Sequence, residues 1–126
     1  MNTVDIGRLG EKHAANFLKR NKFKILEKNI HISHNEIDII AKNKEYIIFV
    51  EVKTRSTGID LYSEFGTPAS AVDLSKQKRT VEAARGYLKT TRYSKLQPRF
   101  DVIEVYINKD DASLLHINHI ANAFGA

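Results

Sequence analysis

The stretch from 35 to 55, NEIDIIAKNKEYIIFVEVKTR, places ionisable side chains inside two apolar segments. Glu36 and Asp38 interrupt the first segment, and Glu51 and Lys53 interrupt the end of the second. Short apolar runs separated by the polar turn KNKE predict two antiparallel strands over 35–42 and 46–53. Carboxylates and an ammonium do not build a hydrophobic core, so these four side chains are the first candidates for chemistry.

The alternation of side chains along a strand places these four residues on matching faces. Glu36 and Asp38 share one face of the first strand, while Glu51 and Lys53 share one face of the second. A two-residue turn at 44–45 sets Asp38 opposite Glu51 and Glu36 opposite Lys53. A register two residues away keeps the same faces together, whereas an odd-residue bulge does not.

Two carboxylates that face each other across a pair of strands repel, at a cost of about 0.2–1 kcal/mol or more when they are partly buried. A divalent cation between Asp38 and Glu51 removes that cost, and Mg²⁺ or Mn²⁺ prefers such oxygen ligands. The Lys53 ammonium would stabilise negative charge on a nearby phosphate. The alternative is structural: Glu36 and Lys53 form a cross-strand ion pair, and Asp38 and Glu51 are solvated.

The remaining elements must position these side chains. A helical period over 5–20 puts Glu11 at the margin of an apolar stripe, where it can overhang the sheet. Thr3 or Asp5 could cap that helix, and Asp73 could cap the next. The predicted elements are a helix over 5–20, strands over 23–32, 35–42 and 46–53, a loop over 54–70, a helix over 74–90, and strands over 99–107 and 114–120. The last strand is expected to run into a terminal helical turn. This order predicts a single α/β domain over 1–126 with a mixed central sheet flanked by helices.

Composition narrows the classes of function. The chain has 20 Lys and Arg against 15 Asp and Glu, and its net charge of +5 favours a polyanionic partner such as nucleic acid. It contains no cysteine, which excludes disulfides and thiolate chemistry. The N-terminal residues have no apolar signal-peptide core, and no apolar run is long enough to span a membrane. We therefore expect a cytoplasmic protein without a membrane partner.

Basic and amide side chains near the candidate site could contact phosphates. They are Arg55, Lys76, Gln77 and Arg79. Lys76 and Arg79 share one face of the predicted second helix, and a solvated helix face is the equally plausible structural interpretation. Asp101 lies in a predicted strand beside basic residues, and an ion pair with Arg99 or another neighbouring arginine is expected.

The pattern of Asp38 followed after a hairpin by Glu51-Val52-Lys53 resembles the PD-(D/E)xK restriction-endonuclease-like superfamily, and the acid on the preceding helix resembles Holliday-junction resolvases. The segments GRLGEKHAANFL, NEIDIIA, FVEVKTR, FGTPASAV and RFDVIEVYI are similar to the YraN-like family of small bacterial proteins, which is endonuclease-like and largely uncharacterised. The similarity runs from Gly7 to about Ile107. Asn35 departs from the glycine that usually precedes Glu-Ile-Asp in that family, and asparagine tolerates the backbone conformations that glycine adopts.

The resemblance implies a restriction-endonuclease-like fold and a role for each matching residue. Asp38 and Glu51 would be metal ligands, with the Val52 carbonyl as a third. Lys53 would be a catalytic base or electrophile. Glu11 would be a carboxylate of a second metal or of the outer shell, and Glu36 would position Lys53 or a water molecule.

These observations lead to three hypotheses. The first is a Mg²⁺- or Mn²⁺-dependent nuclease that hydrolyses DNA phosphodiesters, with branched or junction DNA preferred by analogy; cutting a junction needs two active sites and hence a homodimer. The second is a nucleic-acid-binding module that keeps the site without turnover. The third is an interaction module on a nuclease fold, whose binding depends on the 54–70 loop and tolerates loss of Asp38.

Overall fold

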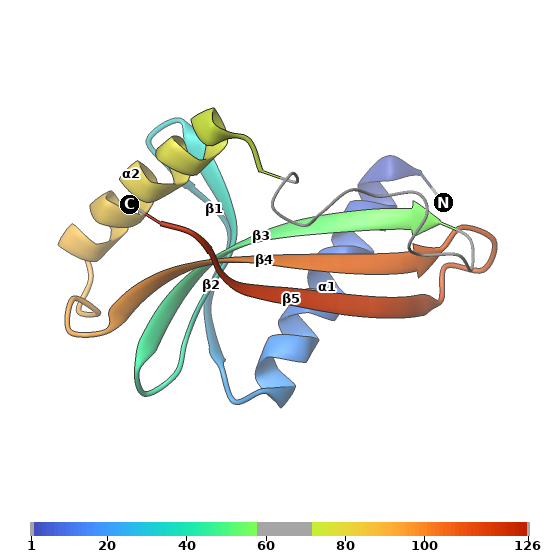
Figure 1. The fold of residues 1–126 in the computed structure, drawn as a ribbon, viewed down its shortest axis with the longest axis horizontal. Helices are drawn as coiled ribbons and strands as arrows, with labels where there is room; N and C mark the ends of the chain where they lie inside the picture. Colours follow the sequence, from blue (N-terminus) through green and yellow to red (C-terminus); the bar gives the residue numbers. More distant parts are fainter. Residues whose placement is uncertain (1, 58–71, 126) are drawn as a thin grey trace.

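The protein is described by a computed structural model that covers residues 2–57 and 72–125. Its strands form one sheet in the order β1-β2-β3-β4-β5, in which β3 and β4 run parallel and the other neighbours antiparallel (Figure 1). The elements are α1 (Thr3–Arg20), β1 (Lys24–Ile32), β2 (Asn35–Lys42), β3 (Tyr46–Thr57), α2 (Leu74–Lys89), β4 (Gln97–Asn108) and β5 (Leu114–Phe124). The predicted order of elements and the restriction-endonuclease-like mixed α/β class are confirmed.

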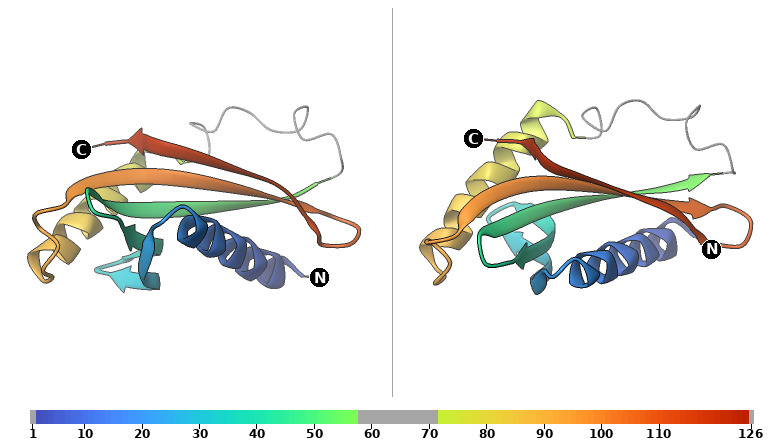
Figure 2. Two further views of the ribbon diagram at one scale, coloured as in Figure 1. Left: turned by 90° about the horizontal axis from the view of Figure 1, so that it is seen from below. Right: turned by 60° about the horizontal axis from the view of Figure 1, so that its bottom comes forward.

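The two helices cover opposite faces of the sheet. Figure 2 shows α1 beneath the middle of the sheet and α2 at the end formed by β1 and β2. Ala14 and Leu18 of α1 pack with Ile39, Val50 and Ile103, all of which are buried. The residues that α2 buries belong to a second cluster, which contains Ile40, Phe49, Val81, Tyr87 and Phe100. Neither α1 nor α2 is long and apolar enough to cross a membrane.

Strands β3, β4 and β5 extend beyond their predicted limits. β3 continues to Thr57 because it pairs in register with β4 as far as Asn108, so the segment predicted as a loop over 54–70 begins as strand. Residues 58–71 of that loop lie outside the described residues. β5 continues to Phe124, and the predicted terminal helical turn is wrong, because Phe124 pairs with Phe100 and the two rings stack at 5.3 Å.

Side-chain caps fix the starts of both helices. Asp73 caps α2 as predicted and accepts the Lys76 amide at 2.8 Å. The cap of α1 is Asn2 instead of Thr3 or Asp5, and its Oδ1 accepts the Asp5 amide at 2.9 Å. Asparagine caps helices as well as serine, threonine or aspartate, so several neighbouring residues could have taken this role. Acidic Asp5 then lies in the first turn of α1, where it favours the helix dipole.

A buried charge network ties β5 to β4. Asp101 is fully buried, and Arg99 donates to both of its carboxylate oxygens at 2.9 and 2.8 Å, which confirms the predicted ion pair. His119 Nε2 lies 2.7 Å from Asp101 Oδ2, and the Asn122 amide donates at 3.0 Å. Burial raises the pKa of Asp101, but the hydrogen bonds from His119, Arg99 and Asn122 outweigh it and hold that pKa below its ordinary value.

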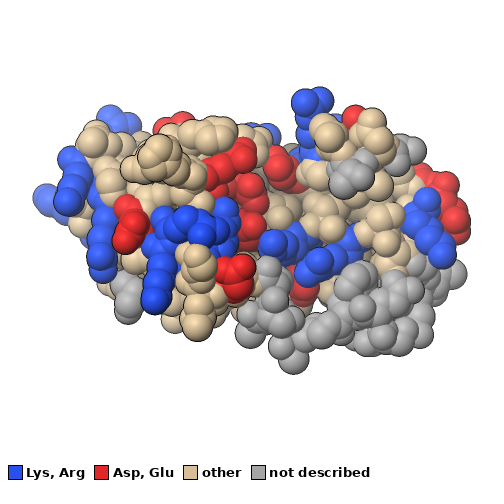
Figure 3. Space-filling model, turned by 90° about the horizontal axis from the view of Figure 1, so that it is seen from above, with Lys and Arg blue, Asp and Glu red and all other residues tan. Residues whose placement is uncertain are grey.

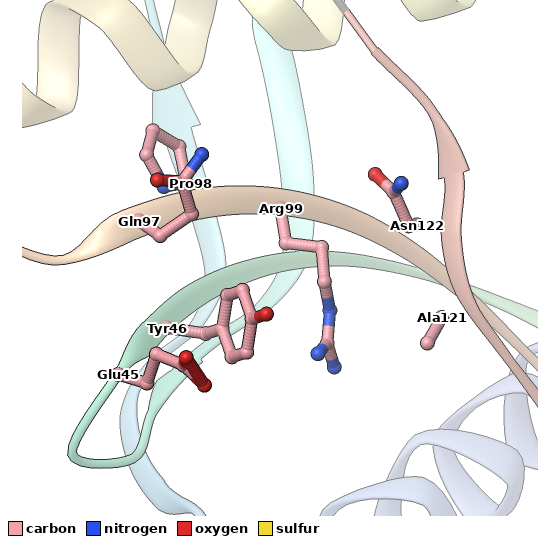
Figure 4. A pocket seen from close by; sticks show the side chains of 7 residues that line it. All are labelled: Glu45, Tyr46, Gln97, Pro98, Arg99, Ala121 and Asn122. Carbon is pink, nitrogen blue, oxygen red and sulfur yellow. The ribbon is translucent and has the colours of Figure 1, made fainter.

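The outer side of this network opens into a pocket of about 450 Å³ (Figure 4). Its walls include Arg99 and Tyr46 on one side and Ala121 and Asn122 of β5 on the other. The Arg99 guanidinium lies over the Tyr46 ring at 4.6 Å from its centroid, so the arginine is held by a carboxylate and an aromatic face together.

Candidate functional site

The candidate site lies where β2 separates from β3. The predicted register of the hairpin is confirmed from Lys42↔Ile47 to Ile39↔Val50, but the pairing ends there, one step before Asp38 and Glu51 would meet. The predicted direct pairing of Asp38 with Glu51 within the ladder is therefore not formed. From Glu51 onward, none of the described strands pairs with the edge of β3 that faced β2.

The separation follows from a bend that β1 and β2 make together. Asn29 of β1 falls between the pairs Lys28↔Ile39 and Ile30↔Ile37, and therefore opposite Asp38. Its φ of 49° is in the left-handed region, which asparagine adopts more readily than most residues. Ile37 and Ile40 both belong to the core cluster of α2, which strict alternation along a strand does not allow. β2 thus turns away from β3 at Asp38.

Asp38 compensates for the lost strand pairing. Its Oδ2 accepts the Val52 amide at 2.8 Å, at a position where β2 no longer supplies a backbone acceptor. Within the described residues, Oδ1 accepts no further hydrogen bond. The carboxylate is consequently held in place by one oxygen while the other can take a ligand.

Side chains from both faces of β3 reach this edge. Val52 packs with the core cluster under α1, so alternation places Glu51 and Lys53 on the opposite face. A pocket of about 320 Å³ is nevertheless lined by Glu51 as well as by Val52 and Thr54. A pocket lined by side chains from both faces of β3 must lie at the edge of the strand, where the two faces meet.

The first helix closes the pocket from the other side. Gly7 and Glu11 of α1 line it together with Asp38 and Glu51, so the predicted position of Glu11 over the sheet is confirmed. The close packing of α1 on β3 depends on Gly10, where an added Cβ would lie 2.7 Å from Thr54 Cγ2 and 2.8 Å from Thr54 Cβ. The sequence reasoning missed Gly10, although a glycine inside a helix costs about 1 kcal/mol and signals such a contact.

Burial and the neighbouring acids raise the pKa of Asp38. The pKa of Asp38 rises from an ordinary 3.8 to about 7, first because of burial and second because of the charge on Glu51. The charges on Glu11 and Glu36 raise it further, and the hydrogen bond from Val52 only partly opposes them. The ionised pocket therefore contains negative charge that the described residues do not fully compensate.

Lys53 brings one positive charge to this group. Its Nζ lies 3.5 Å from Glu51 Oε1, and its side chain is 30% exposed. The structural alternative paired Lys53 with Glu36, and among the described residues that ion pair is not formed. The second half of that alternative, in which Asp38 and Glu51 are fully solvated, is also wrong, because both side chains are half-buried.

The donor set fits a divalent cation that takes some of its ligands from water or substrate. Asp38 and Glu51 offer carboxylate oxygens, and the Val52 carbonyl belongs to the uncovered edge of β3. Mg²⁺ and Mn²⁺ commonly take one or two carboxylates and complete their shell with water and phosphate oxygens. The described residues contain no cluster of three or more His, Cys, Asp or Glu side chains arranged around one metal.

Glu36 and the predicted phosphate contacts lie outside the pocket. Glu36 is exposed and pairs with His31 of β1, so its part in the site is limited to its charge on Asp38. Lys76 Nζ donates to Asn35 Oδ1 at 3.1 Å and to the Glu36 carbonyl at 3.4 Å, which brings α2 to the start of β2. Asn35 does not adopt a left-handed φ; Ser33, at 58°, takes that conformation in the turn.

The other predicted contacts have local partners or lie farther along β3. Gln77 donates to the Val72 carbonyl at 2.9 Å, and Arg79 donates to Ser75 at 2.7 Å. Arg55 is half-buried two residues beyond Lys53. Figure 3 shows acidic side chains gathered in the middle of one face with Lys and Arg side chains on either side. Lys76 of α2 contacts the backbone carbonyl of Glu36, and Lys53 of β3 contacts the carboxylate of Glu51.

Comparisons with known proteins agree on one family. The profile described as "Uncharacterised protein family UPF0102" matches residues 10–105. A UPF0102 protein of Caldanaerobacter subterraneus is 45% identical over 124 residues, which cover 98% of both chains. A UPF0102 protein of Clostridioides difficile is 44% identical over 124 residues, covering 98% of this chain and 100% of its own. One from Syntrophotalea carbinolica is 45% identical over 113 residues, covering 90% of this chain and 88% of its own.

Proposed function

The chain belongs to the uncharacterised protein family UPF0102, as its YraN-like segments predicted, and we propose that it is a Mg²⁺- or Mn²⁺-dependent nuclease that hydrolyses phosphodiester bonds in DNA. The observation that carries the proposal is the pocket at the fork of β2 and β3. There, Asp38 and Glu51 converge beneath Glu11, and Lys53 is paired with Glu51.

Asp38 and Glu51 would hold the cation, with the Val52 carbonyl as a third ligand. The bound cation would polarise the phosphate and lower the pKa of a nearby water molecule. Because Val52 fixes Asp38 through Oδ2, this carboxylate would keep its orientation whether or not a ligand is present. Burial and the neighbouring acids supply the driving force, since a cation relieves the repulsion that raises the pKa of Asp38.

Lys53 would act on the substrate. Its ammonium would donate to a non-bridging phosphate oxygen, where negative charge increases as water attacks. In the hydrolysis, the oxygen of a water molecule bonds to phosphorus, one phosphorus–oxygen ester bond breaks, and the leaving oxygen takes up a proton. Glu11 would orient water at the side of the pocket formed by α1.

The substrate preference follows from charge. A net charge of +5 and the Lys and Arg side chains on both sides of the acidic group favour a polyanion that crosses the pocket (Figure 3). Lys76, Arg79 and Arg55 would contact backbone phosphates, and Gln77 would act mainly through the start of α2. Branched or junction DNA remains the preferred substrate by resemblance, and a homodimer would supply the two active sites that it needs.

Cleavage of labelled linear, flap and four-way DNA would test this function. We expect cleavage by the wild-type protein with Mg²⁺ or Mn²⁺, and none by the Asp38→Asn or Lys53→Met variants. Asp110→Asn is the matched control, because Asp110 is exposed in the turn between β4 and β5, away from the pocket. Equal cleavage by all four proteins, or intact DNA with the wild type at every metal concentration, would refute the proposal.

A second candidate is a nucleic-acid-binding module without turnover. It is favoured by the finding that the described residues present two carboxylates and one carbonyl instead of three or more clustered acidic or histidine ligands. This candidate predicts salt-sensitive DNA binding that survives Asp38→Asn, with no cleavage by any variant. An interaction module, the third hypothesis, predicts no salt-sensitive DNA binding at all.

A further inference from the structure

The edge strand β5 lies in a segment without formal charge. All 20 Lys and Arg and all 15 Asp and Glu residues of the chain precede Ala112. β5 runs from Leu114 to Phe124 and pairs with β4 on one side only. Among the described strands none pairs with its other side, which presents backbone donors and acceptors with no charged side chain of β5 among them.

Proteins usually protect such an edge with charges, prolines or bends, because an open strand can pair with another chain. The opposite edge of this sheet is protected by charge: β1 includes Lys24, Glu27 and Lys28. Each edge strand also has one residue with a left-handed φ, Asn29 at 49° in β1 and Asn122 at 54° near the end of β5. β5 has irregular pairing only near its ends, between Tyr106 and Ile107 of β4 and between Phe100 and Val102. Between those two points, residues 116–120 pair regularly with β4, and within the described part of the chain no strand pairs with their other side.

We propose that two copies of the protein pair through β5, antiparallel and centred on Asn118, to form one continuous sheet across a two-fold axis. Asn118 is the middle residue of the regular stretch 116–120. In this register His116 lies opposite Ile120 of the second copy, and Ile117 lies opposite His119. No Lys, Arg, Asp or Glu of β5 meets a like charge, whereas β1 paired with itself would bring its lysines and glutamate together.

The two ends of β5 also complement each other. Leu114, at one end, is a large apolar side chain that is 39% exposed. Ala121 and Asn122, at the other end, line the pocket of about 450 Å³ beside Arg99 (Figure 4). Pairing about Asn118 brings the Leu114 end of one copy to the Asn122 end of the other, beyond the regular stretch on both sides, and the two-fold axis repeats this approach.

Leu114 and the pocket beside Arg99 lie on the same face of the sheet, the face that α1 covers. Leu114 pairs with Ile107, which packs in the core cluster under α1. Arg99 pairs with Ile48, which packs in the same cluster. A two-fold axis perpendicular to the sheet keeps the α1 faces of both copies on one side, so Leu114 would meet the pocket on its open side. The proposal is independent of whether the protein cleaves DNA.

Sedimentation velocity over a range of protein concentrations would measure the predicted dimer. We expect a concentration-dependent monomer–dimer equilibrium for the wild type, because a pair of edge strands is a small interface. Leu114→Lys should shift the protein to monomer by bringing charge to both ends of the interface. Leu74→Lys is the matched control, since Leu74 is 72% exposed on α2, and it should dimerise like the wild type.

A cysteine at the proposed axis would test the register. The chain has no cysteine, and Asn118→Cys would place two thiols opposite each other at a distance that a disulfide can bridge. Mild oxidation should give a covalent dimer of Asn118→Cys but not of Leu74→Cys. A wild type that stays monomeric at all concentrations would overturn the proposal, and so would a dimer that Leu114→Lys does not weaken; both results are available even if Asn118→Cys fails to fold.

Discussion

Replacing Asp38 by asparagine should stabilise the metal-free protein at neutral and alkaline pH. Asparagine keeps an oxygen that can accept the Val52 amide, as Asp38 Oδ2 does at 2.8 Å, but it removes the charge. That charge is unfavourable in the folded protein because it is partly buried and lies near Glu51 and Glu11. The variant therefore separates the role of Asp38 in holding the fork together from the cost of its ionisation.

The magnitude follows from the pKa of Asp38, which is 3.8 ordinarily and about 7 in the fold. The folded state keeps its proton over this interval while the unfolded state has lost it, so the stability of the wild type falls as the pH rises from about 4 to about 7. At about 1.4 kcal/mol per pH unit, the full loss is on the order of 4 kcal/mol. Solvent screening at the half-exposed pocket reduces this, and we expect Asp38→Asn to be more stable by about 2 kcal/mol at about pH 8.

Urea denaturation followed by circular dichroism, in the presence of a chelator, would measure this difference. The two proteins should have similar stability near pH 4 and diverge as the pH approaches 7. Glu51→Gln should give part of the same gain, and the double variant should gain less than the sum of the two, because both changes relieve one repulsion. Parallel stability curves for wild type and Asp38→Asn from pH 4 to 8 would refute the reasoning; Asp110→Asn controls for a general effect of charge.

Three further predictions concern other parts of the molecule. Gly10→Ala should destabilise the fold by about 1–3 kcal/mol, because the new methyl group overlaps Thr54 and forces α1 away from β3. Gly7→Ala should not destabilise it, because no atom lies within 4 Å of the added Cβ. Urea denaturation of both variants would measure the difference. Asp101→Asn should cost about 3–5 kcal/mol, because it leaves the half-buried Arg99 guanidinium without its charged partner. The difference from wild type should shrink only as the pH falls through the lowered pKa of Asp101, as measured by thermal unfolding. Lys76→Gln should weaken DNA binding and reduce the slope of log affinity against log salt concentration by about 1, which fluorescence anisotropy would measure; an unchanged slope would remove Lys76 from the phosphate contacts.

Local patterns were sufficient for the parts of the fold that depend on near neighbours. The turn at 44–45 and the apolar alternation gave the hairpin register from Lys42↔Ile47 to Ile39↔Val50. Asp73 was recognisable as a cap because its side chain acts on the next turn of the same helix. Asp101 and Arg99 are two residues apart on one strand, so their ion pair could be predicted from spacing.

The fork that shapes the candidate site could not be predicted in this way. It depends on the left-handed φ of Asn29 in β1, and asparagine adopts that conformation only where the surrounding structure favours it. Alternation therefore carried the β2–β3 pairing three steps too far, to Glu36 opposite Lys53, whereas the ion pair of Lys53 is with Glu51. Glu11, Asp38, Glu51 and Val52 nevertheless line one pocket, because a shared pocket does not require that Asp38 and Glu51 pair within the ladder; Ile6, Gly7 and Thr54, which also line it, were not predicted.

Contacts between distant segments account for the other differences. β5 continues past residue 120 because Phe124 stacks on Phe100, and the sequence around Phe124 alone does not show this. The close approach of Gly10 to Thr54 likewise joins a helix to a strand more than forty residues away. Such contacts decide where an element ends and how near it lies to the site, while periodicity decides only its type.

The central claim is that Asp38 and Glu51 bind a divalent cation, and calorimetric titration of Mn²⁺ at about pH 8 tests it most directly, since Asp38 is then ionised. Wild type and Asp110→Asn should bind the metal with the same affinity, and Asp38→Asn should lose that binding. An absence of Mn²⁺ binding by the wild type, or equal binding by Asp38→Asn, would contradict the account.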